Sequence, residues 1–561
     1  MCAASGVSWR TAGCDMNVWR AGFWTGSVGQ SVLIVIGILL RLRHYFENRS
    51  FWQDEICLAL SITNRSFQEI WQHVLLFPDF AQAPLFFQIV EKSFVSVLGN
   101  SEMSLRLFPL LASIASVFLA RRFFQRFLDP VASTVALAAF ILVEPLVYFA
   151  AELKPYGVDV LAAFLVYELF IYLGRTWSLR AIFFFAAGGA LVIWASNAML
   201  FIMAGCGAVI FLEKLREREW PRVAILAGCY LAWALSLALL YHLSLGRMLN
   251  PDLLKNWRLT GGFAPAPLWT LDGLAWLARV VPDMFRSPLG MGWPYVMVVF
   301  FGVGCYSFWR KDRGLAIFLA APMVLTLLAA SFEKYPFYER MILFLVPALL
   351  AIWAAGVRDM AAKASRYGAW LTGAVIMVVL AFPVTLAFEN AIHPREKEEN
   401  RQAMDFLAGQ YRPGDLIAIS PQAQYPFWYY GQRTGLNQKI AAHAMPDEGL
   451  FAASVIQLFP NVVTEKGINM LALRNVVNVY DGEGYYRKFL LMGRKSDVVR
   501  VPEISPDALK GMGRVWIFLS HHNDPQYPSF VERVFSRAGV KLAGFEGAGV
   551  AVFLYNIPGG K

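Results

Sequence analysis

Runs of about twenty mostly apolar residues recur along this 561-residue chain. A membrane-spanning helix needs about 20 such residues, so each run is a candidate span. The composition agrees, because 57% of the residues are hydrophobic and 16% are charged, against about 45–50% and about 25% in soluble domains. This excludes a water-soluble enzyme, a disordered chain and a disulfide scaffold. We therefore predict a polytopic α-helical membrane protein with about 11 transmembrane helices. The predicted spans are 23–41, 103–121, 131–150, 157–174, 180–195, 197–213, 222–243, 292–309, 314–331, 339–356 and 368–388.

Basic residues gather in alternate loops between these spans, which predicts the orientation. Positive loops face the cytoplasm, so the N-terminus is expected inside and the C-terminus outside. The first helix disagrees locally, because Arg41, Arg43 and His44 fall at its outer end. We give the downstream loops more weight. They contain Arg121, Arg122, Arg126, Arg175, Arg180, Lys214, Arg216, Arg218, Arg222, Arg310, Lys311, Arg313, Arg358, Lys363 and Arg366.

The same topology divides the chain into two expected domains. Residues 1–388 form a transmembrane module with a long first external loop over 42–102, and residues 244–291 form a second external segment. Residues 389–561 change composition and alternate strand-like and helix-like runs. Such alternation is typical of an α/β domain, which this topology places on the periplasmic side. Its expected elements are a charged helix at 393–410, strands at 415–420, 514–520 and 550–556, and a helix at 531–539.

Several function classes lack a sequence signal. The net charge of +10 is explained by the basic loops that set membrane orientation. It does not indicate nucleic-acid binding, because no basic patch has interleaved aromatic residues. The six cysteines form no CxxC pair, so neither a zinc site nor a disulfide framework is expected. No GxxxxGK[ST] pattern indicates a nucleotide site.

An acidic pair, Asp54 and Glu55, follows the first predicted span in the sequence FWQDEICL. A carboxylate at a membrane mouth is costly to desolvate and usually has a task or a partner. The alternative is a solvated loop pair or a helix N-cap, because Asp favours such positions. Position alone does not separate these two interpretations.

Two further charged clusters fall at predicted outer mouths. The segment AELKPYGVDVL (151–161) carries Glu152, Lys154 and Asp159 beside apolar spans. Lys154 could simply extend its amine to the interface, whereas Asp159 begins an apolar run and favours a site or a buried partner. In FEKYPFYERMILFLVP (332–347), Arg340 is either an interface anchor paired with Glu339 or a phosphate contact. All three clusters fall on one predicted side of the membrane, which favours a single site.

These motifs resemble the membrane-embedded glycosyltransferases of the GT-C superfamily. The resemblance is carried by WQDE (52–55), APLFF (83–87), LGNSEMSLRLFPLLAS (98–113), AAELKPYGVDVLAAFL (150–165) and YERMILFLVPALL (338–350). The chain is most similar to the bacterial branch of protein O-mannosyltransferases, lipid A aminoarabinose transferases and lipopolysaccharide galacturonosyltransferases. The order and combination of motifs are specific, although each motif alone is weak.

The resemblance implies an inner-membrane enzyme that takes a sugar from a polyprenyl-phosphate donor at the periplasmic face. The acceptor would be an envelope glycolipid, polysaccharide or protein. The first-loop acidic residue of the family falls on Asp54, with Glu55 beside it, and its basic-to-Asp spacing falls on Lys154 and Asp159. Its late arginine falls on Arg340. The arginine of its second helix falls on Arg106, which we interpret as structural.

One departure concerns metal binding. The family often has a polar ligand such as His and two prolines where this chain reads AQAP (81–84), with a single Pro84. Some relatives bind a divalent metal near this loop. No cofactor is firmly implied here, and a metal is an open question.

The chemistry of sugar transfer agrees with these assignments. A carboxylate that removes the acceptor proton contributes about 10²–10⁴ in rate, and Asp54 is our candidate base. Glu55 or Asp159 would orient the acceptor or the base, and Asp159 is the alternative base. A cation near the departing phosphate stabilises the growing charge. Candidate substrate contacts are Lys154, Arg340, Arg258, Glu152 and Tyr156. Direct displacement predicts inversion at the anomeric carbon.

Two alternatives remain from other classes. A transporter or lipid flippase would fit the spans, but no inverted repeat or matched pair of broken helices is evident. A non-catalytic envelope assembly subunit would use the 389–561 domain to bind partners. The set of Asp54, Lys154 and Asp159 favours an enzyme over both.

Overall fold

The computed structural model describes most of the chain. The described residues are 26–72, 83–246, 257–367, 369–395, 397–436, 475–480, 486–492, 513–521 and 526–558, with Lys439 and Gly511. They divide into two compact units. In described residues, the first unit is 26–47, 67–72 and 83–394, and the second is 48–66 with the part that follows 394. Asn48–Ser66, from the expected first external loop, thus groups with the C-terminal part of the chain.

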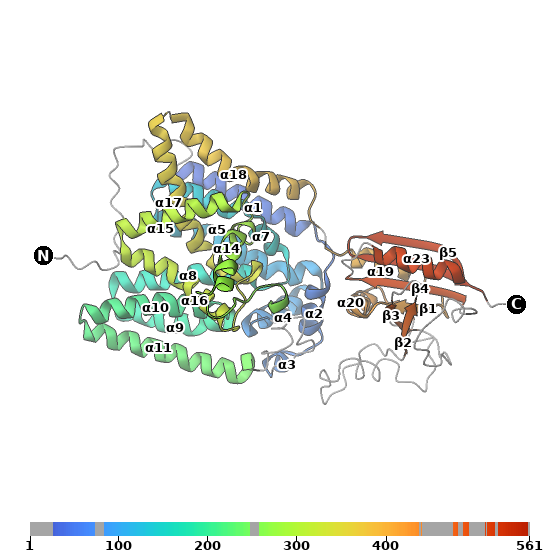
Figure 1. Ribbon diagram of the computed structural model, residues 1–561. Coiled ribbons are helices and arrows are strands. Elements are labelled where there is room, and N and C mark those ends of the chain that lie inside the picture. Colours follow the sequence, from blue (N-terminus) through green and yellow to red (C-terminus); the bar gives the residue numbers. More distant parts are fainter. Residues whose placement is uncertain are drawn as a thin grey trace. The chain divides into compact units, whose positions relative to one another are not determined.

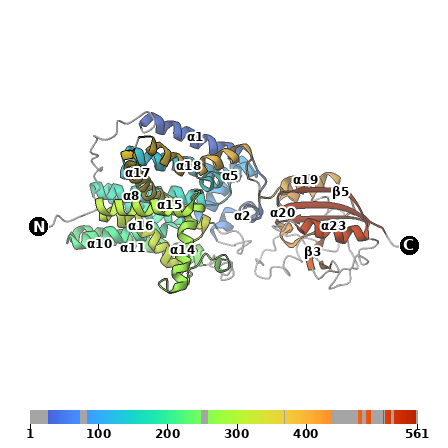
Figure 2. The ribbon, with the colours of Figure 1, turned by 45° about the horizontal axis from the view of Figure 1, so that its top comes forward.

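The first unit is helical, and its long helices run side by side (Figures 1 and 2). Its α-helices are α1 (Ser27–Phe46), α3 (Phe67–Trp71), α4 (Leu85–Leu98), α5 (Glu102–Phe127), α6 (Pro130–Leu142), α7 (Glu144–Tyr148), α8 (Tyr156–Thr176), α9 (Leu179–Ala195), α10 (Met199–Arg216), α11 (Trp220–Leu240), α14 (Leu271–Arg286), α15 (Pro294–Lys311), α16 (Arg313–Ser331), α17 (Val346–Ala364) and α18 (Ala369–Ile392). Shorter turns are the 3₁₀ segments Phe149–Ala151, Glu339–Leu345 and Ser365–Tyr367 and the π-helical turn Tyr241–Leu245.

A helix occupies each of the eleven segments that were predicted to span the membrane. The fold class of a polytopic helical membrane protein is therefore confirmed, but the number of spans is not. Among the described residues, seven helical stretches are long and apolar enough to cross a membrane. There are eight if α6 and the segment Glu144–Ala151 together form one span; the two are bent by 55° relative to each other. The other three predicted spans do not qualify: α9 has only 17 residues, α10 ends in Glu213, Lys214 and Arg216, and α15 ends in Arg310 and Lys311.

Helix ends follow local sequence signals. Ser101 caps α5 by accepting a hydrogen bond from the Ser104 amide at 3.0 Å, and Asp129 caps α6 through two amides, just before Pro130 at its first position. Such caps satisfy amides that have no partner within the helix. The loops that separate the spans are therefore fixed at defined residues.

Glycines let α15 and α17 approach backbone to backbone. A Cβ on Gly304 would lie 1.8 Å from the Ile352 carbonyl oxygen, and a Cβ on Gly356 would lie 1.8 Å from that of Phe300. Small residues permit such close packing in membrane bundles, where the lipid offers no hydrophobic drive for association. The wall formed by these two helices depends on both glycines.

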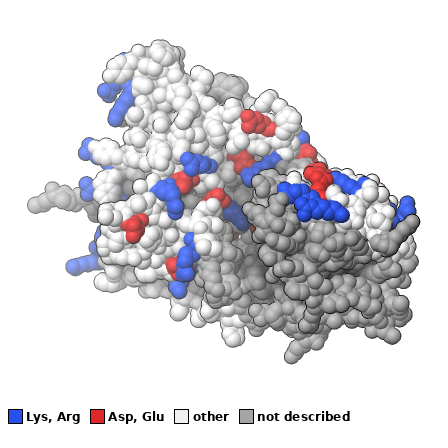
Figure 3. Space-filling model, turned by 45° about the vertical axis from the view of Figure 1, so that its right-hand side comes forward, with Lys and Arg blue, Asp and Glu red and all other residues white. Residues whose placement is uncertain are grey.

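The basic loops meet at one end of the helical unit, which we call the basic rim. Arg358, late in α17, lies 3.2 Å from Asp129 at the start of α6, and Arg222 lies over the Trp177 ring at 5.0 Å. Lys and Arg gather along this edge in the space-filling view (Figure 3). The basic loops therefore lie at one end of the helical unit, as expected for loops on the same side of a membrane.

The disagreement of the first helix has a structural explanation. Arg41 is fully buried; its Nε donates to Ser113 Oγ at 2.8 Å and its Nη1 to the Gly37 carbonyl at 2.9 Å. His44 is buried too, and Arg43 is paired with Glu47. Orientation depends on positive charges in the loops near the ends of the spans. Arg41 is buried and the charge of Arg43 is balanced by Glu47, so neither contradicts the predicted orientation.

The second unit is a three-layer α/β domain, which confirms the predicted class of the C-terminal domain. Its sheet has the order β2-β3-β1-β4-β6-β5, with β1 and β4 parallel and the other neighbours antiparallel. The elements are α2 (Gln53–Thr63), α19 (Asn400–Gln410), β1 (Leu416–Ile419), α20 (Gln424–Arg433), β2 (Asn475–Tyr480), β3 (Tyr486–Met492), β4 (Gly513–Ser520), α23 (Gln526–Ala538), β5 (Val540–Gly547) and β6 (Val550–Ile557), with a 3₁₀ turn at Pro421–Ala423.

Both faces of the central strand β4 are covered. Its odd-numbered residues, including Ile517, pack in one core with Val534 and Phe535 of α23. On the other face, Trp516 contacts Phe406 of α19 and Phe518 contacts Phe427 of α20, at ring distances of 6.1 and 5.9 Å. A strand buried on both faces reads as a continuous apolar run, which is why the sequence predicted it.

Candidate functional site

The acidic pair lies in the first turn of α2, in the second unit. The N-cap is Trp52, which makes no side-chain cap bond, and Gln53 is the first helical residue. Asp54 is half-buried and Glu55 is 1% exposed. These positions do not fit the alternatives of an N-cap or a solvated loop pair. Carboxylates in the first turn of a helix interact favourably with the helix dipole.

Glu398 and its neighbours hold the start of α2. Glu398 Oε2 accepts hydrogen bonds from the Gln53 amide at 3.1 Å and from Asn400 Nδ2 at 2.7 Å. Asn400 Nδ2 also donates to the Phe51 carbonyl at 3.0 Å. Tyr430 Oη accepts from the Phe51 amide at 2.8 Å. These groups are buried, where satisfied hydrogen bonds fix geometry most strongly, so α2 begins at a defined place.

His521 completes this network from the end of β4. Its Nδ1 lies 2.6 Å from Glu398 Oε1. Burial lowers the pKa of His521, but the hydrogen bond and charge of Glu398 and the charge of Asp54 outweigh this and raise the pKa above its ordinary value. His521 also has a φ of 55°, a left-handed conformation that is uncommon outside glycine and that recurs at functional sites. The imidazole therefore faces the acidic start of α2.

A second group of polar residues meets in the first unit, at the end opposite to the basic rim, because α8 starts there and ends at the rim. The Arg340 guanidinium lies 5.9 Å from the centre of the Tyr156 ring. Asp159 shares the first turn of α8 with Tyr156 and lies near Ser196, whose buried hydroxyl forms no hydrogen bond with the described residues. Burial and the nearby Asp159 and Tyr156 raise the pKa of the Tyr335 phenol well above its usual range. We call these residues the mouth cluster: Tyr156, Asp159, Ser196, Tyr335 and Arg340.

Lys154 and Glu152 directly precede the mouth cluster in the chain. They lie in the turn between Phe149–Ala151 and α8, where the Lys154 amide donates to the Glu152 carbonyl at 2.8 Å. Lys154 is 4% exposed and Glu152 1%. A lysine that extends its amine to the interface leaves its head in water, which does not fit this burial. Buried charges beside apolar spans are costly and usually functional.

Other residues from the sequence have structural partners. Arg258 forms a two-bond ion pair with Glu333 on the exposed surface, so a phosphate contact by Arg258 would require this pair to open. Arg106 is 3% exposed within α5. In the second unit, Asp415 accepts hydrogen bonds from Arg514 Nε at 2.8 Å and Trp516 Nε1 at 2.9 Å, which gives it a structural role.

The sequence left open whether a divalent metal binds near the AQAP segment (81–84). Among the described residues, no three His, Cys, Asp or Glu side chains gather as they would around an ion. Residues 81 and 82 of the AQAP segment, and His522 beside His521, lie outside the described residues.

Sequence reasoning missed several residues of these two groups. Ser196, which follows α9, and Tyr335, in the turn after α16, lie near Asp159. Glu398 and Asn400 contact the start of α2 from about 350 positions along the chain. Ser196 leaves a weak signal, because it interrupts two apolar runs. Glu398 sits in a charged stretch that resembles a solvated helix.

No protein-family model and no curated protein matches the chain. Among solved structures, it is similar to ArnT from Cupriavidus metallidurans in the apo state, with a TM-score of 0.49, 12% identity and coverage of 94% of this chain and 98% of that one. The same ArnT bound to undecaprenyl phosphate gives a TM-score of 0.47 at the same identity and coverage.

An oligosaccharyltransferase from Archaeoglobus fulgidus, in complex with Zn and sulfate, is also similar, with a TM-score of 0.44 and 12% identity over 71% of this chain and 56% of that one. At these scores the likeness is distant, so the function proposed below rests on the residues of this chain.

Proposed function

We propose that this membrane protein is a glycosyltransferase that moves a monosaccharide from a polyprenyl-phosphate-linked donor to an envelope glycolipid, polysaccharide or protein. The observation that carries the proposal is the Arg340 guanidinium, 5.9 Å from the centre of the Tyr156 ring. Tyr156 shares the first turn of α8 with Asp159, at one end of an apolar bundle. An apolar bundle suits a lipid carrier, while a cation and a carboxylate suit its charged head and the incoming hydroxyl.

The reaction assigns one role to each charged group. A carboxylate, Asp54 in our assignment, takes the proton of the acceptor hydroxyl as its oxygen bonds to the anomeric carbon. The bond from that carbon to the phosphate oxygen breaks, and polyprenyl phosphate leaves with the electron pair. Lys154 and Arg340 stabilise the charge that grows on this phosphate. Attack opposite the leaving group inverts the anomeric centre, and Asp159 is the alternative base.

The orientation belongs to the same proposal. With the basic rim in the cytoplasm, the mouth cluster faces the periplasm of the inner membrane, and the second unit follows α18 on that side. The donor then needs no nucleotide at the site, because the energy resides in the sugar–phosphate bond of the lipid.

Binding of undecaprenyl phosphate tests the proposal directly. Native mass spectrometry of the full-length protein should detect the lipid on the wild type. Lys154→Gln and Arg340→Gln should each weaken binding at least about tenfold, since a charge-assisted hydrogen bond contributes about 1.5–3 kcal/mol. Arg310→Gln, which changes an exposed arginine of the basic rim, is the matched control.

Thermal melting of each variant keeps the result interpretable, because Lys154 is buried. Arg340→Gln provides a second reading if Lys154→Gln lowers stability. The proposal fails if folded variants of both residues bind the lipid as the wild type does, or if the wild type does not bind it.

A further inference from the structure

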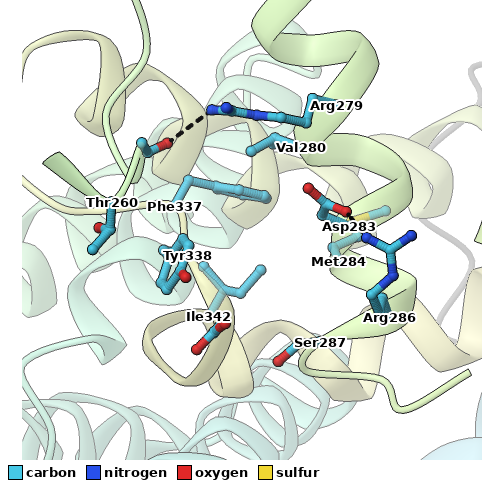
Figure 4. Close-up of a pocket in the computed structure, with 12 residues that line it drawn as sticks. Thr260, Arg279, Val280, Asp283, Met284, Arg286, Ser287, Phe337, Tyr338 and Ile342 are labelled. Carbon is cyan, nitrogen blue, oxygen red and sulfur yellow. Dashed lines mark hydrogen bonds and ion pairs between the residues drawn. The ribbon is translucent and has the colours of Figure 1, made fainter. Parts of the chain in front are cut away.

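A cavity of about 290 Å³ lies in the first unit between α14 and the segment that carries Arg340. Figure 4 shows Arg279 and Asp283 of α14 on one side, with Thr260 and Tyr338 across from them. The mouth cluster does not include these side chains. The volume is at the lower limit of small-molecule sites, which are about 300–1,000 Å³, so it suits one small ligand unit rather than a chain of them.

The walls of the cavity are fixed by hydrogen bonds around Gly261. The Gly261 carbonyl accepts from Trp276 Nε1 at 3.0 Å, and Arg279 Nη2 lies 3.5 Å from the same oxygen. Gly261 has a φ of 76°, and a Cβ there would lie 2.7 Å from Arg279 Nη2. The Phe337 amide donates to the Gly262 carbonyl at 2.8 Å, which ties the other wall. The cavity is therefore built into the fold rather than left between loose segments.

The cavity has an apolar floor and a polar rim. Val280, Met284 and Phe337 are nearly inaccessible to solvent, and they line the same space as Arg279 and Asp283. Glu339, at a φ of 34°, adds a carboxylate from a backbone conformation that is uncommon outside glycine and recurs at ligand sites. Small-molecule sites combine such an apolar surface with a few placed polar groups.

The charges select the class of ligand. Arg279 and Arg286 supply two positive charges, and Asp283 and Glu339 supply two negative ones, so the lining is neutral overall. Arg286 Nη1 lies 2.7 Å from Asp283 Oδ1 (Figure 4), so this ion pair offers a ligand its remaining donors and acceptors. A phosphate is an anion, which two carboxylates would repel. A sugar hydroxyl both donates and accepts, so guanidinium and carboxylate groups can each bind it. The apolar floor suits the C–H face of a sugar ring.

We infer that this cavity binds one neutral monosaccharide unit, either the sugar of the donor or the terminal sugar of the acceptor. This inference rests on the proposed function and names a subsite for it. Four residues between Phe337 and Ile342 line the cavity, and the same segment carries Arg340. Residues that would contact the sugar are therefore adjacent in sequence to the proposed phosphate contact.

The test measures binding of methyl α- and β-pyranosides of glucose, galactose and mannose to the full-length protein in nanodiscs. Saturation-transfer difference NMR detects weak ligands in contact with a large protein. At least one glycoside should give a signal with the wild type. Asp283→Asn and Arg279→Gln should each weaken its affinity at least about tenfold. Asp272→Asn, the same change in the exposed first turn of α14, should leave the affinity unchanged.

A second experiment distinguishes the donor sugar from the acceptor sugar. Undecaprenyl phosphate mannose and undecaprenyl phosphate glucose are added in excess to the protein with the bound glycoside. Loss of the glycoside signal assigns the subsite to the donor sugar, and a persisting signal assigns it to the acceptor. Either result supports a sugar subsite.

Three results would each overturn the inference. The first is that no glycoside gives a signal, and the second is that Asp283→Asn and Arg279→Gln bind a glycoside as the wild type does. The third is that inorganic phosphate alone binds in a way that depends on Arg279. Binding of undecaprenyl phosphate is measured on the same preparations. A protein that binds this lipid but no glycoside contradicts the subsite alone, whereas one that binds neither contradicts the proposed function as well.

Discussion

His521 Nδ1 lies 2.6 Å from Oε1 of Glu398, whose other oxygen accepts the Gln53 amide at the start of α2. The two contacts link the end of β4 to the helix that carries Asp54 within one compact unit. Glu398 is buried, and a buried carboxylate is tolerated when it is paired and hydrogen-bonded. The histidine thus helps to hold the acidic turn in place.

The first prediction concerns the pH dependence of stability. Because the folded-state pKa of His521 is raised above its ordinary value, its stabilisation is complete below about pH 6.5 and is lost as the pH rises through the folded pKa. The difference in melting temperature between the wild type and His521→Gln should therefore be largest in mild acid and shrink in alkali. A difference that does not change with pH would show that the ion pair contributes nothing.

The second prediction concerns the backbone of α2. Glu398→Ala removes the acceptor of the Gln53 amide, so hydrogen exchange at Gln53 should accelerate and sugar transfer should fall because Asp54 is less well placed. Loss of a buried charged partner costs about 3–5 kcal/mol. Glu532→Ala removes an exposed ion pair with Lys541 and should change neither reading. Unchanged exchange in Glu398→Ala would contradict the role of this carboxylate.

The third prediction compares two glycines of α15. Gly304→Ala places a methyl group against the Ile352 carbonyl of α17, while Gly302→Ala meets nothing within 4 Å. Overpacking costs about 1–3 kcal/mol or more, so Gly304→Ala should lower the melting temperature and Gly302→Ala should not. Equal stability of the two variants would mean that α15 and α17 are not packed through Gly304.

The fourth prediction tests the orientation with single cysteines in a background without native cysteines. A cysteine at Arg218, in the loop between α10 and α11, should react with a membrane-impermeant maleimide only after spheroplasts are lysed. A cysteine at Glu333, beyond the end of α16, should react in intact spheroplasts. The reverse pattern would place the mouth cluster in the cytoplasm and exclude a periplasmic reaction.

The sequence predicted what depends on local patterns. Apolar runs indicated the helices of the first unit, and the runs at 415–420, 514–520 and 550–556 indicated β1, β4 and β6. The strand β5 was missed because it is an exposed strand at the edge of the sheet, without an apolar run. The helix predicted at 393–410 begins only at Asn400, and the described residues 393–395 and 397–399 before it are not helical. Pro394 disfavours a helix at this point.

Contacts between distant residues were beyond the sequence. Nothing local indicates that Arg41 bonds Ser113, or that Glu398 bonds the start of α2. The same holds for Ser196 and Tyr335 beside Asp159. These contacts result from tertiary packing, which one sequence does not encode in any local period.

The most direct test of the central claim is mass spectrometry of envelope glycolipids, polysaccharides and glycoproteins from a strain that lacks the gene. The strain carries no copy, the wild type, Asp54→Asn or Asp405→Asn at matched expression. Asp405 is an exposed residue of α19, so its variant is the control for the same chemical change.

We predict that one class of molecule loses a single sugar mass in the deletion strain, and that the wild type and Asp405→Asn restore it while Asp54→Asn does not. Restoration by Asp54→Asn would contradict the assignment of the base and move it to Asp159. Identical profiles with and without the wild-type protein would contradict sugar transfer itself.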